Sequence, residues 1–126
     1  MLQISTKPPK RAVLVIFNKM NLNILPFFDI EEKNAIQQRL NDGVQIIPYS
    51  KQQKTYFLFP LEIDLTAKPD NIHEKLRVQG NSIYKMCKEY KESEISLEVL
   101  GDFDKEYIAS ILSGINLSDY EFLKYR

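Results

Sequence analysis

The sequence contains a single histidine and a single cysteine, His73 and Cys87, and this scarcity excludes several kinds of site. One cysteine cannot form a disulfide within the chain. Any Ser-His-Asp or Cys-His arrangement would depend on His73 alone, and a histidine-rich zinc site lacks its ligands. We therefore expect His73 to be an exposed structural residue near the start of a helix. Cys87 is expected to be a small buried hydrophobic residue, with a reactive thiol as the alternative.

Glycine and excess charge are scarce as well. The four glycines, at positions 43, 80, 101 and 114, are too dispersed for a loop that cradles phosphate, and no GxGxxG or Walker pattern occurs. The 17 Lys and Arg residues balance the 17 Asp and Glu residues, so the chain has no overall basic footprint for nucleic acid or anionic lipid. We expect neither nucleic acid nor a membrane as a partner, and no cofactor or metal ion bound by this chain.

A short basic run stands near the beginning, where Lys7, Lys10 and Arg11 flank Pro8-Pro9. Because the prolines interrupt the run, we interpret it as a solvated segment leading into the first long strand. A phosphate site is the alternative.

Long hydrophobic runs are also missing. The apolar run Val13–Phe17 is too short to span a membrane or to serve as a good signal-peptide core. The cytoplasm is the compartment that fits this sequence best.

The residue pattern predicts one α/β domain over residues 1–126, in which strands alternate with helical stretches. We expect a three-layer sandwich with a central mixed sheet of about five or six strands flanked by helices. Strands are predicted around Leu2 and Ile4, and at Ala12–Phe17, Val44–Ile47, Thr55–Leu61 and Ile95–Val99. Helices are predicted from Asp29 or Ile30 to Asn41, from Pro69 toward Tyr90, and from Asp104 onward.

Several positions give these elements sharper expectations. Ala12–Phe17 is apolar throughout, which is typical of a central strand that is buried on both faces. Pro48 is expected to stop the third strand, and Tyr49–Lys54 to form a polar hairpin loop. Gly80 interrupts the long helix and suggests a close approach to a neighbouring backbone, while Asp104 suits an N-cap.

The final stretch, Asp104–Arg126, has the apolar spacing of a helix that packs on a core. Its apolar stripe consists of Ile108, Ile111, Leu112 and Ile115. Three aromatic residues, Tyr120, Phe122 and Tyr125, follow this stripe. Tyr and Phe bury large areas with few rotatable bonds, so we predict that these three contact a neighbouring domain or partner. The alternative is that the tail folds back on its own domain.

Paired carboxylates are the remaining candidates for chemistry. They are Glu31 with Glu32, Glu92 with Glu94, and Asp102 with Asp104. A two-carboxylate acid–base site needs one group in an apolar pocket, and these pairs stand in charged or turn-like contexts. We therefore expect them to be solvated cap and loop residues, and we expect the aromatic run at Tyr56, Phe57 and Phe59 to be core.

The tail sequence LSGINLSDYEFLKYR, residues 112–126, resembles the segment that ends the N-terminal domain of leucyl (cytosolic) aminopeptidases. Residues that match the family pattern are Gly114, Tyr120, Phe122, Lys124 and Tyr125. Ser113, Asn116 and Leu123 depart from it, at positions where the family has an acidic, an apolar and an Asp residue. A weaker similarity occurs at Leu76–Gly80, which resembles an Arg-x-x-Gly segment of the same domain. The order of elements is also similar to that domain, whose fold is related to the macro domain.

The resemblance implies that the chain is a non-catalytic accessory domain with a structural, oligomerisation or regulatory role. In that family a separate C-terminal domain performs peptide hydrolysis with two divalent metal ions, zinc or manganese, and the full-length protein is a hexamer. The chain alone would then be inactive, with the peptidase domain and further copies as its partners. The alternative is a stand-alone macro-like module that binds ADP-ribose or another nucleotide, although Asn41-Asp42-Gly43 and Gly101-Asp102 each offer only one glycine beside an aspartate.

Overall fold

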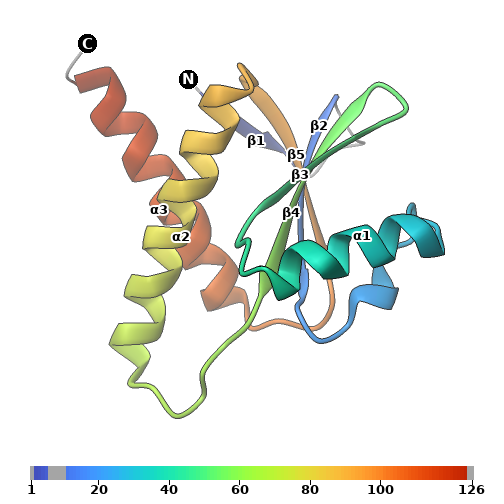
Figure 1. Cartoon of the computed structure of the whole chain (residues 1–126). Helices are drawn as coiled ribbons and strands as arrows, with labels where there is room; N and C mark the ends of the chain where they lie inside the picture. The colour runs from blue at the N-terminus through green and yellow to red at the C-terminus, as the bar shows by residue number, and fades with distance from the viewer. Residues whose placement is uncertain (1, 6–10, 125–126) are drawn as a thin grey trace. The chain divides into compact units, whose positions relative to one another are not determined.

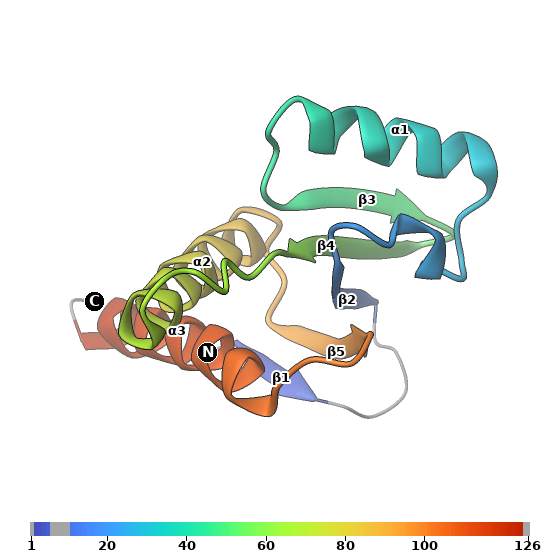
Figure 2. The same cartoon turned by 90° about the horizontal axis from the view of Figure 1, so that it is seen from below.

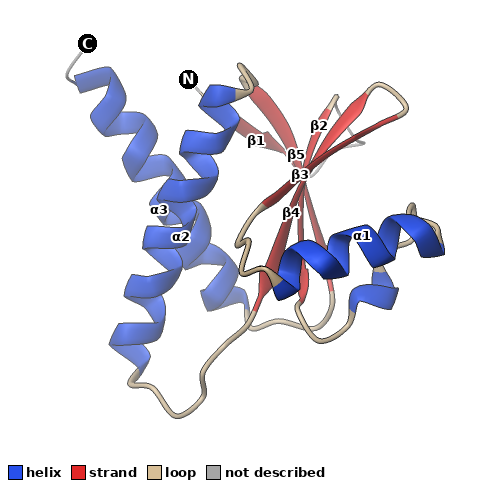
Figure 3. Cartoon of the chain, in the orientation of Figure 1, coloured by secondary structure: helices blue, strands red, loops and turns tan. Residues whose placement is uncertain are grey.

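The computed structural model describes residues 2–5 and 11–124, with side chains described as far as residue 116. Figure 1 labels the elements in chain order, and Figure 3 colours them by type. They are β1 (Gln3–Ser5), β2 (Ala12–Asn18), the short 3₁₀ helix η1 (Leu22–Ile24), α1 (Ile30–Asn41), β3 (Ile47–Lys51), β4 (Lys54–Leu61), α2 (Pro69–Glu89), β5 (Glu94–Leu100) and α3 (Lys105–Lys124).

Within the described residues, five strands form one mixed sheet in the order β1-β5-β2-β4-β3. β2 occupies the centre and pairs in parallel with both β4 and β5, whereas β3 pairs antiparallel with β4. Parallel strands need long connections: η1, α1 and β3 lie between β2 and β4 in the chain, and α2 lies between β4 and β5, which flank β2 on opposite sides. The predicted α/β class with a mixed sheet, and the central position of Ala12–Phe17, are therefore confirmed.

The chain divides into two compact units, which we describe separately. The sheet unit comprises residues 4–62 and 95–101 and holds β2, η1, α1, β3, β4 and most of β5. The helical unit comprises residues 2–3, 63–94 and 102–124 of the described chain and holds α2 and α3.

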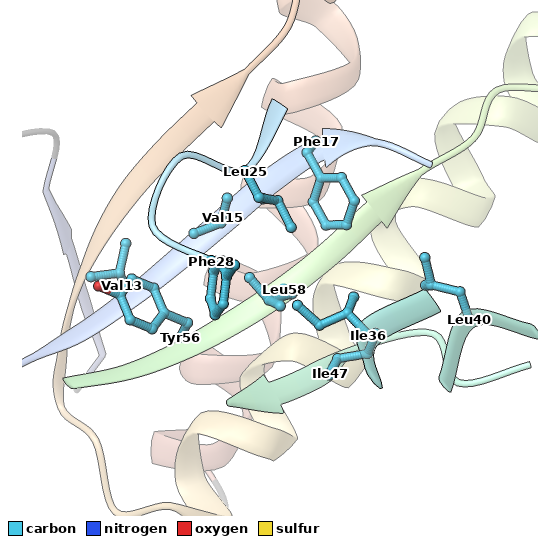
Figure 4. Close-up of a cluster of buried hydrophobic side chains, with 10 residues drawn as sticks. All are labelled: Val13, Val15, Phe17, Leu25, Phe28, Ile36, Leu40, Ile47, Tyr56 and Leu58. Carbon is cyan, nitrogen blue, oxygen red and sulfur yellow. The ribbon is translucent and has the colours of Figure 1, made fainter. Parts of the chain in front are cut away.

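One face of the sheet unit carries a dense apolar cluster, drawn in Figure 4. Alternate residues of β2 contribute Val13, Val15 and Phe17, because side chains on the same face of a strand recur every second position. The cluster is completed by residues from η1's flank, α1, β3 and β4, namely Leu25, Phe28, Ile36, Leu40, Ile47, Tyr56 and Leu58. Leu14 and Ile16 of the opposite face are fully buried too, so the expectation of a strand buried on both faces is confirmed.

Helix α1 begins at Ile30, one of the two predicted starts. Asp29 is the N-cap and accepts a hydrogen bond from the Glu32 backbone N–H, while the Glu32 carboxylate accepts one from the Asp29 N–H. This reciprocal capping box satisfies two backbone donors that the first helical turn leaves unpaired. The helix ends at Asn41, and Gly43 follows with a φ of +84°, which glycine adopts at no steric cost.

The prediction for the third strand was wrong. The strand does not span Val44–Ile47, because β3 runs from Ile47 to Lys51 and passes through Pro48. β3 is an edge strand, so a residue without an N–H is tolerated there if that position faces outward. The Thr55 backbone N–H points toward β2, where it donates to the Arg11 carbonyl oxygen. Backbone N–H groups alternate in direction along a strand, so the N–H of Phe57, two residues later, also points away from β3. Pro48 lies opposite Phe57, so the two form a non-hydrogen-bonded pair and no N–H is needed at position 48 to bond β4.

The hairpin between β3 and β4 is confirmed, although its loop is shorter than predicted. Lys51 pairs with Lys54, which leaves only Gln52 and Gln53 in the turn. Both have positive φ values, 51° and 65°. A two-residue turn of this kind matches the twist of the flanking strands, but Asn-Gly is its usual sequence. Sequence reasoning missed the turn because glutamine is not a turn signal.

In the helical unit, α2 starts with Pro69 at its first turn, as predicted, and α3 starts after Asp104, whose carboxylate accepts from the Glu106 N–H at 3.1 Å. Leu76, Ile83 and Cys87 are buried on α2, whereas Tyr90, predicted on the same face, is 44% exposed at the helix end. Figures 1 and 2 show α2 and α3 side by side. They run in the same direction, since His73 meets Ser110 and Arg77 meets Gly114.

Candidate functional site

The predicted contact residues Tyr120 and Phe122 belong to α3, which continues to Lys124, but their side chains lie outside the described part of the structure. Tyr125 lies outside the described residues altogether. Their role as a partner surface therefore stays a prediction. What the structure does place is the helix from which the tail extends and the contact that α3 makes with α2.

Two glycines allow the backbones of α2 and α3 to approach closely. A Cβ atom added to Gly114 would stand 2.0 Å from the Arg77 carbonyl oxygen, and one added to Gly80 would stand 2.2 Å from the Ile111 carbonyl oxygen. Both distances are far inside van der Waals contact, so only glycine fits at either position. The close backbone approach predicted for Gly80 is confirmed, and its neighbour is α3.

This contact brings together the two segments on which the sequence resemblance depends. Arg77 and Gly80 belong to the Arg-x-x-Gly segment of α2, and Gly114 belongs to the tail pattern of α3. They are separated by 34 or more positions in the sequence and touch in the fold. The matched glycines thus have a shared physical role in packing this helix pair.

His73 and Ser110 form a side-chain pair in the same helical unit. The His73 Nδ1 and Ser110 Oγ atoms are 2.6 Å apart, and the Tyr107 ring lies 5.8 Å from the histidine ring, centroid to centroid. Ser110 is only 8% exposed and His73 is half-buried. A nucleophilic serine must reach a substrate carbonyl, and a hydroxyl held between packed helices is poorly placed to do so. We interpret the pair as a hydrogen bond that joins α2 to α3.

Sequence reasoning missed this pair, and it described His73 as exposed. The partner could not be found from the sequence, because nothing in the local pattern links positions 73 and 110. Only the parallel direction of α2 and α3 brings them together.

Cys87 is fully buried, as predicted. Burial, assisted by the nearby Glu92 carboxylate, raises the pKa of the Cys87 thiol to about 12. Because the thiolate is the reactive form, Cys87 is inert at neutral pH.

The acidic pairs do not converge on a site. Among the residues that the structure describes, no group of three or more His, Cys, Asp or Glu side chains is arranged to hold a metal ion. Asp104 is a helix cap, as predicted. Glu32 is a cap residue, as predicted, but it is not a solvated one, because its carboxylate also forms an ion pair with Lys51 in the sheet unit.

Lys51 and Glu32 are the centre of a small polar network beside the apolar cluster. The Lys51 Nζ lies 2.7 Å from the Glu32 carboxylate, donates to the Phe27 carbonyl oxygen, and stands 5.4 Å from the centre of the Phe28 ring. The Lys51 hydrogen bond, followed by the Asp29 backbone bond, lowers the pKa of Glu32, and the same ion pair raises the pKa of Lys51. The network ties the start of α1 to β3.

Tyr49 lies next to this network, and its ring packs edge-on against Phe28 with ring centres 5.1 Å apart. Burial, followed by the Glu32 charge, raises the pKa of Tyr49. Tyr56, Phe57 and Phe59 are buried, which confirms that the aromatic run of β4 is core.

Comparisons of the chain with protein-family models, with curated proteins and with solved structures gave no match. Over the residues that the structure describes, none of the helices combines the length and the apolar composition that crossing a membrane requires.

Proposed function

We propose that this chain is a non-catalytic accessory domain of a leucyl-aminopeptidase-like protein, with a structural or oligomerisation role beside a peptidase domain. The observation that carries the proposal is the contact between α2 and α3. The two segments that resemble the N-terminal domain of that family supply the glycines at which the helices touch. A pattern match between distant segments gains weight when its residues share one physical role.

The order of elements supports the same proposal, because the mixed α/β sheet and its helices follow the order that the resemblance implies. In such a protein the hydrolytic chemistry would belong to the peptidase domain, where two zinc or manganese ions polarise the peptide carbonyl and activate water. This domain would contribute folding, positioning and subunit contacts. The cytoplasm is the compartment proposed for it.

The tail of α3 is the proposed docking element. Tyr120, Phe122 and Tyr125 follow the part of the helix that packs on α2, and they match the family pattern. Aromatic side chains contribute strongly to interfaces because they bury large areas at low entropic cost. In the full-length protein they would contact the peptidase domain or another subunit of a hexamer.

The first test reads the coding sequence downstream of the Arg126 codon. A following domain that contains metal-binding Asp, Glu and Lys residues supports the accessory role. A stop codon at that position contradicts it.

A second test measures activity and assembly. The purified chain should not hydrolyse leucine p-nitroanilide in the presence of zinc or manganese, and turnover that a chelator abolishes would contradict the proposal. In the longer protein, the double change Tyr120→Ser and Phe122→Ser should shift the hexamer toward smaller species in size-exclusion chromatography with light scattering. A matched change on the exposed surface of α2, Val78→Ser, should leave the assembly unchanged.

A further inference from the structure

An open hollow lies at the hairpin end of the sheet unit, and all its lining side chains can donate hydrogen bonds. It has a volume of about 560 Å³ and is lined by Arg11, Ser50, Gln53 and Thr55. Pockets that bind small molecules have volumes of about 300–1,000 Å³, so the hollow is large enough for one. We call it the hairpin hollow.

The sheet register explains why these side chains meet. Ser50 and Thr55 are directly opposite each other on β3 and β4, and Thr55 is also level with Ala12 of β2, next to Arg11. The Thr55 N–H donates to the Arg11 carbonyl at 2.8 Å, so Ser50 and Thr55 form a non-hydrogen-bonded pair. Side chains of such pairs lie close together. Strand alternation directs both hydroxyls to the face opposite the apolar cluster.

Every lining side chain can donate a hydrogen bond, and none of the four carries a carboxylate. Arg11 adds a permanent positive charge on a planar group that suits two oxygens at once. In the described part of the chain, the side chains of Ser50, Gln53 and Thr55 make no hydrogen bond to protein groups, and Thr55 is only 9% exposed. Donors gathered around a hollow in this way favour an acceptor-rich ligand.

The turn supplies the fourth lining side chain. Gln52 and Gln53 both occupy the left-handed backbone region, with φ values of 51° and 65°, where glycine or asparagine would be less strained. Only Gln53 lines the hollow. A glycine there would relax the backbone and would also remove a lining amide.

We propose that the hairpin hollow binds the oxyanion group, phosphate or carboxylate, of a small ligand. Arg11 supplies the charge, the Ser50 and Thr55 hydroxyls donate to the oxygens, and the Gln53 amide closes the site from the turn. The Lys7, Lys10 and Arg11 run of the sequence thereby contributes its last member to a site that the proposed accessory role does not use. Lys51, also in the hairpin, is paired with Glu32 and belongs to the other face.

The experiment is an amide NMR titration of the isotope-labelled chain with sodium phosphate and, separately, with sodium acetate at constant ionic strength. Saturable shifts are expected at Ser50, Gln53 and Thr55, with a dissociation constant of roughly 1–10 mM for such small probes. Shifts with phosphate alone assign a phosphate group, and shifts with acetate alone assign a carboxylate. Absence of saturable shifts with both anions would overturn the proposal.

The two turn residues provide a matched pair of variants. Gln52→Gly and Gln53→Gly should both raise the melting temperature, because each relieves a left-handed non-glycine residue. Only Gln53→Gly should weaken anion binding, by roughly three- to tenfold. Equal binding by the two glycine variants would contradict the proposal, because their backbones are relaxed alike and only the lining differs.

Removing the positive charge of Arg11 should weaken anion binding more than Gln53→Gly does. Arg11→Gln should weaken binding by about tenfold or more, whereas Lys19→Gln, which removes the same charge beyond the other end of β2, should not. Retained binding by Arg11→Gln would overturn the proposal. If that variant does not fold, the comparison of Gln52→Gly with Gln53→Gly tests the proposal by itself.

Discussion

The sheet unit and the helical unit hold their parts together in opposite ways. In the sheet unit, large side chains such as Phe17, Phe28 and Leu58 fill the space between β2, β4 and α1. In the helical unit, the backbones of α2 and α3 approach closely where side chains are missing, at Gly80 and Gly114. The first arrangement is damaged by removing atoms and the second by adding them. Smaller side chains should therefore destabilise the sheet unit, and larger ones should destabilise the contact between α2 and α3.

The largest expected effect comes from removing atoms in the sheet unit. Phe17→Ala deletes a fully buried ring from the central strand and should lower the free energy of unfolding by about 3–5 kcal/mol, because the surrounding side chains cannot close the cavity. Urea denaturation followed by circular dichroism measures this. Phe27→Ala is the matched control, since Phe27 is half-exposed and should cost far less. Comparable losses for the two would show that the sheet unit does not depend on the drawn cluster.

Adding one methyl group to the helical unit should have the next largest effect. Gly114→Ala places a Cβ against the Arg77 carbonyl, so α2 and α3 must separate. We expect a loss of about 2–3 kcal/mol in the free energy of unfolding, despite the better helix propensity of alanine. Ser113→Ala, one position earlier on α3, adds no atoms at the contact and should stay within about 0.5 kcal/mol of the parent. A Gly114→Ala variant as stable as Ser113→Ala would refute the close contact.

The smallest effect concerns the Glu32–Lys51 pair, which adds an electrostatic contribution to the sheet unit. The pKa of Glu32 is lowered in the folded state, so its ionised form stabilises the fold fully above the unfolded pKa of about 4.3. That contribution is lost as the pH falls through the folded pKa. Glu32→Gln should therefore lower the melting temperature at pH ~7, and the difference from the parent should shrink toward zero at pH ~3.

Glu31→Gln is the control for this pair, because it removes an exposed carboxylate from the same helical turn without touching Lys51. It should change the melting temperature less than Glu32→Gln at neutral pH. A Glu32→Gln effect that does not depend on pH would contradict the electrostatic explanation.

Local patterns were sufficient where a single stretch decides its own structure. The unbroken apolar run of β2 indicated burial on both faces, and α1 has the predicted bounds, from Ile30 to Asn41. The predicted bounds of the third strand are wrong because Pro48 does not end the strand. Whether proline ends a strand depends on whether that position faces a neighbouring strand, and this is a property of the sheet order rather than of the segment.

The candidate sites were less accessible from sequence for a related reason. The His73–Ser110 bond and the contact of Gly114 with Arg77 depend on the direction in which two distant helices run. The hairpin hollow depends on register, which sets Ser50 opposite Thr55 and level with Ala12. Gly80 was the exception, since a glycine inside a helix already indicates that something must approach closely.

Pro48 has a consequence for the behaviour of the protein at high concentration. An edge strand usually offers a row of unpaired N–H and C=O groups on which a strand from another molecule can add, and repeated addition leads to aggregation. In β3 the outward-facing position at Pro48 has no N–H to offer, so an incoming strand would lose a hydrogen bond in the middle of its ladder. The residue that misled the strand prediction thus protects this edge of the sheet from open-ended growth.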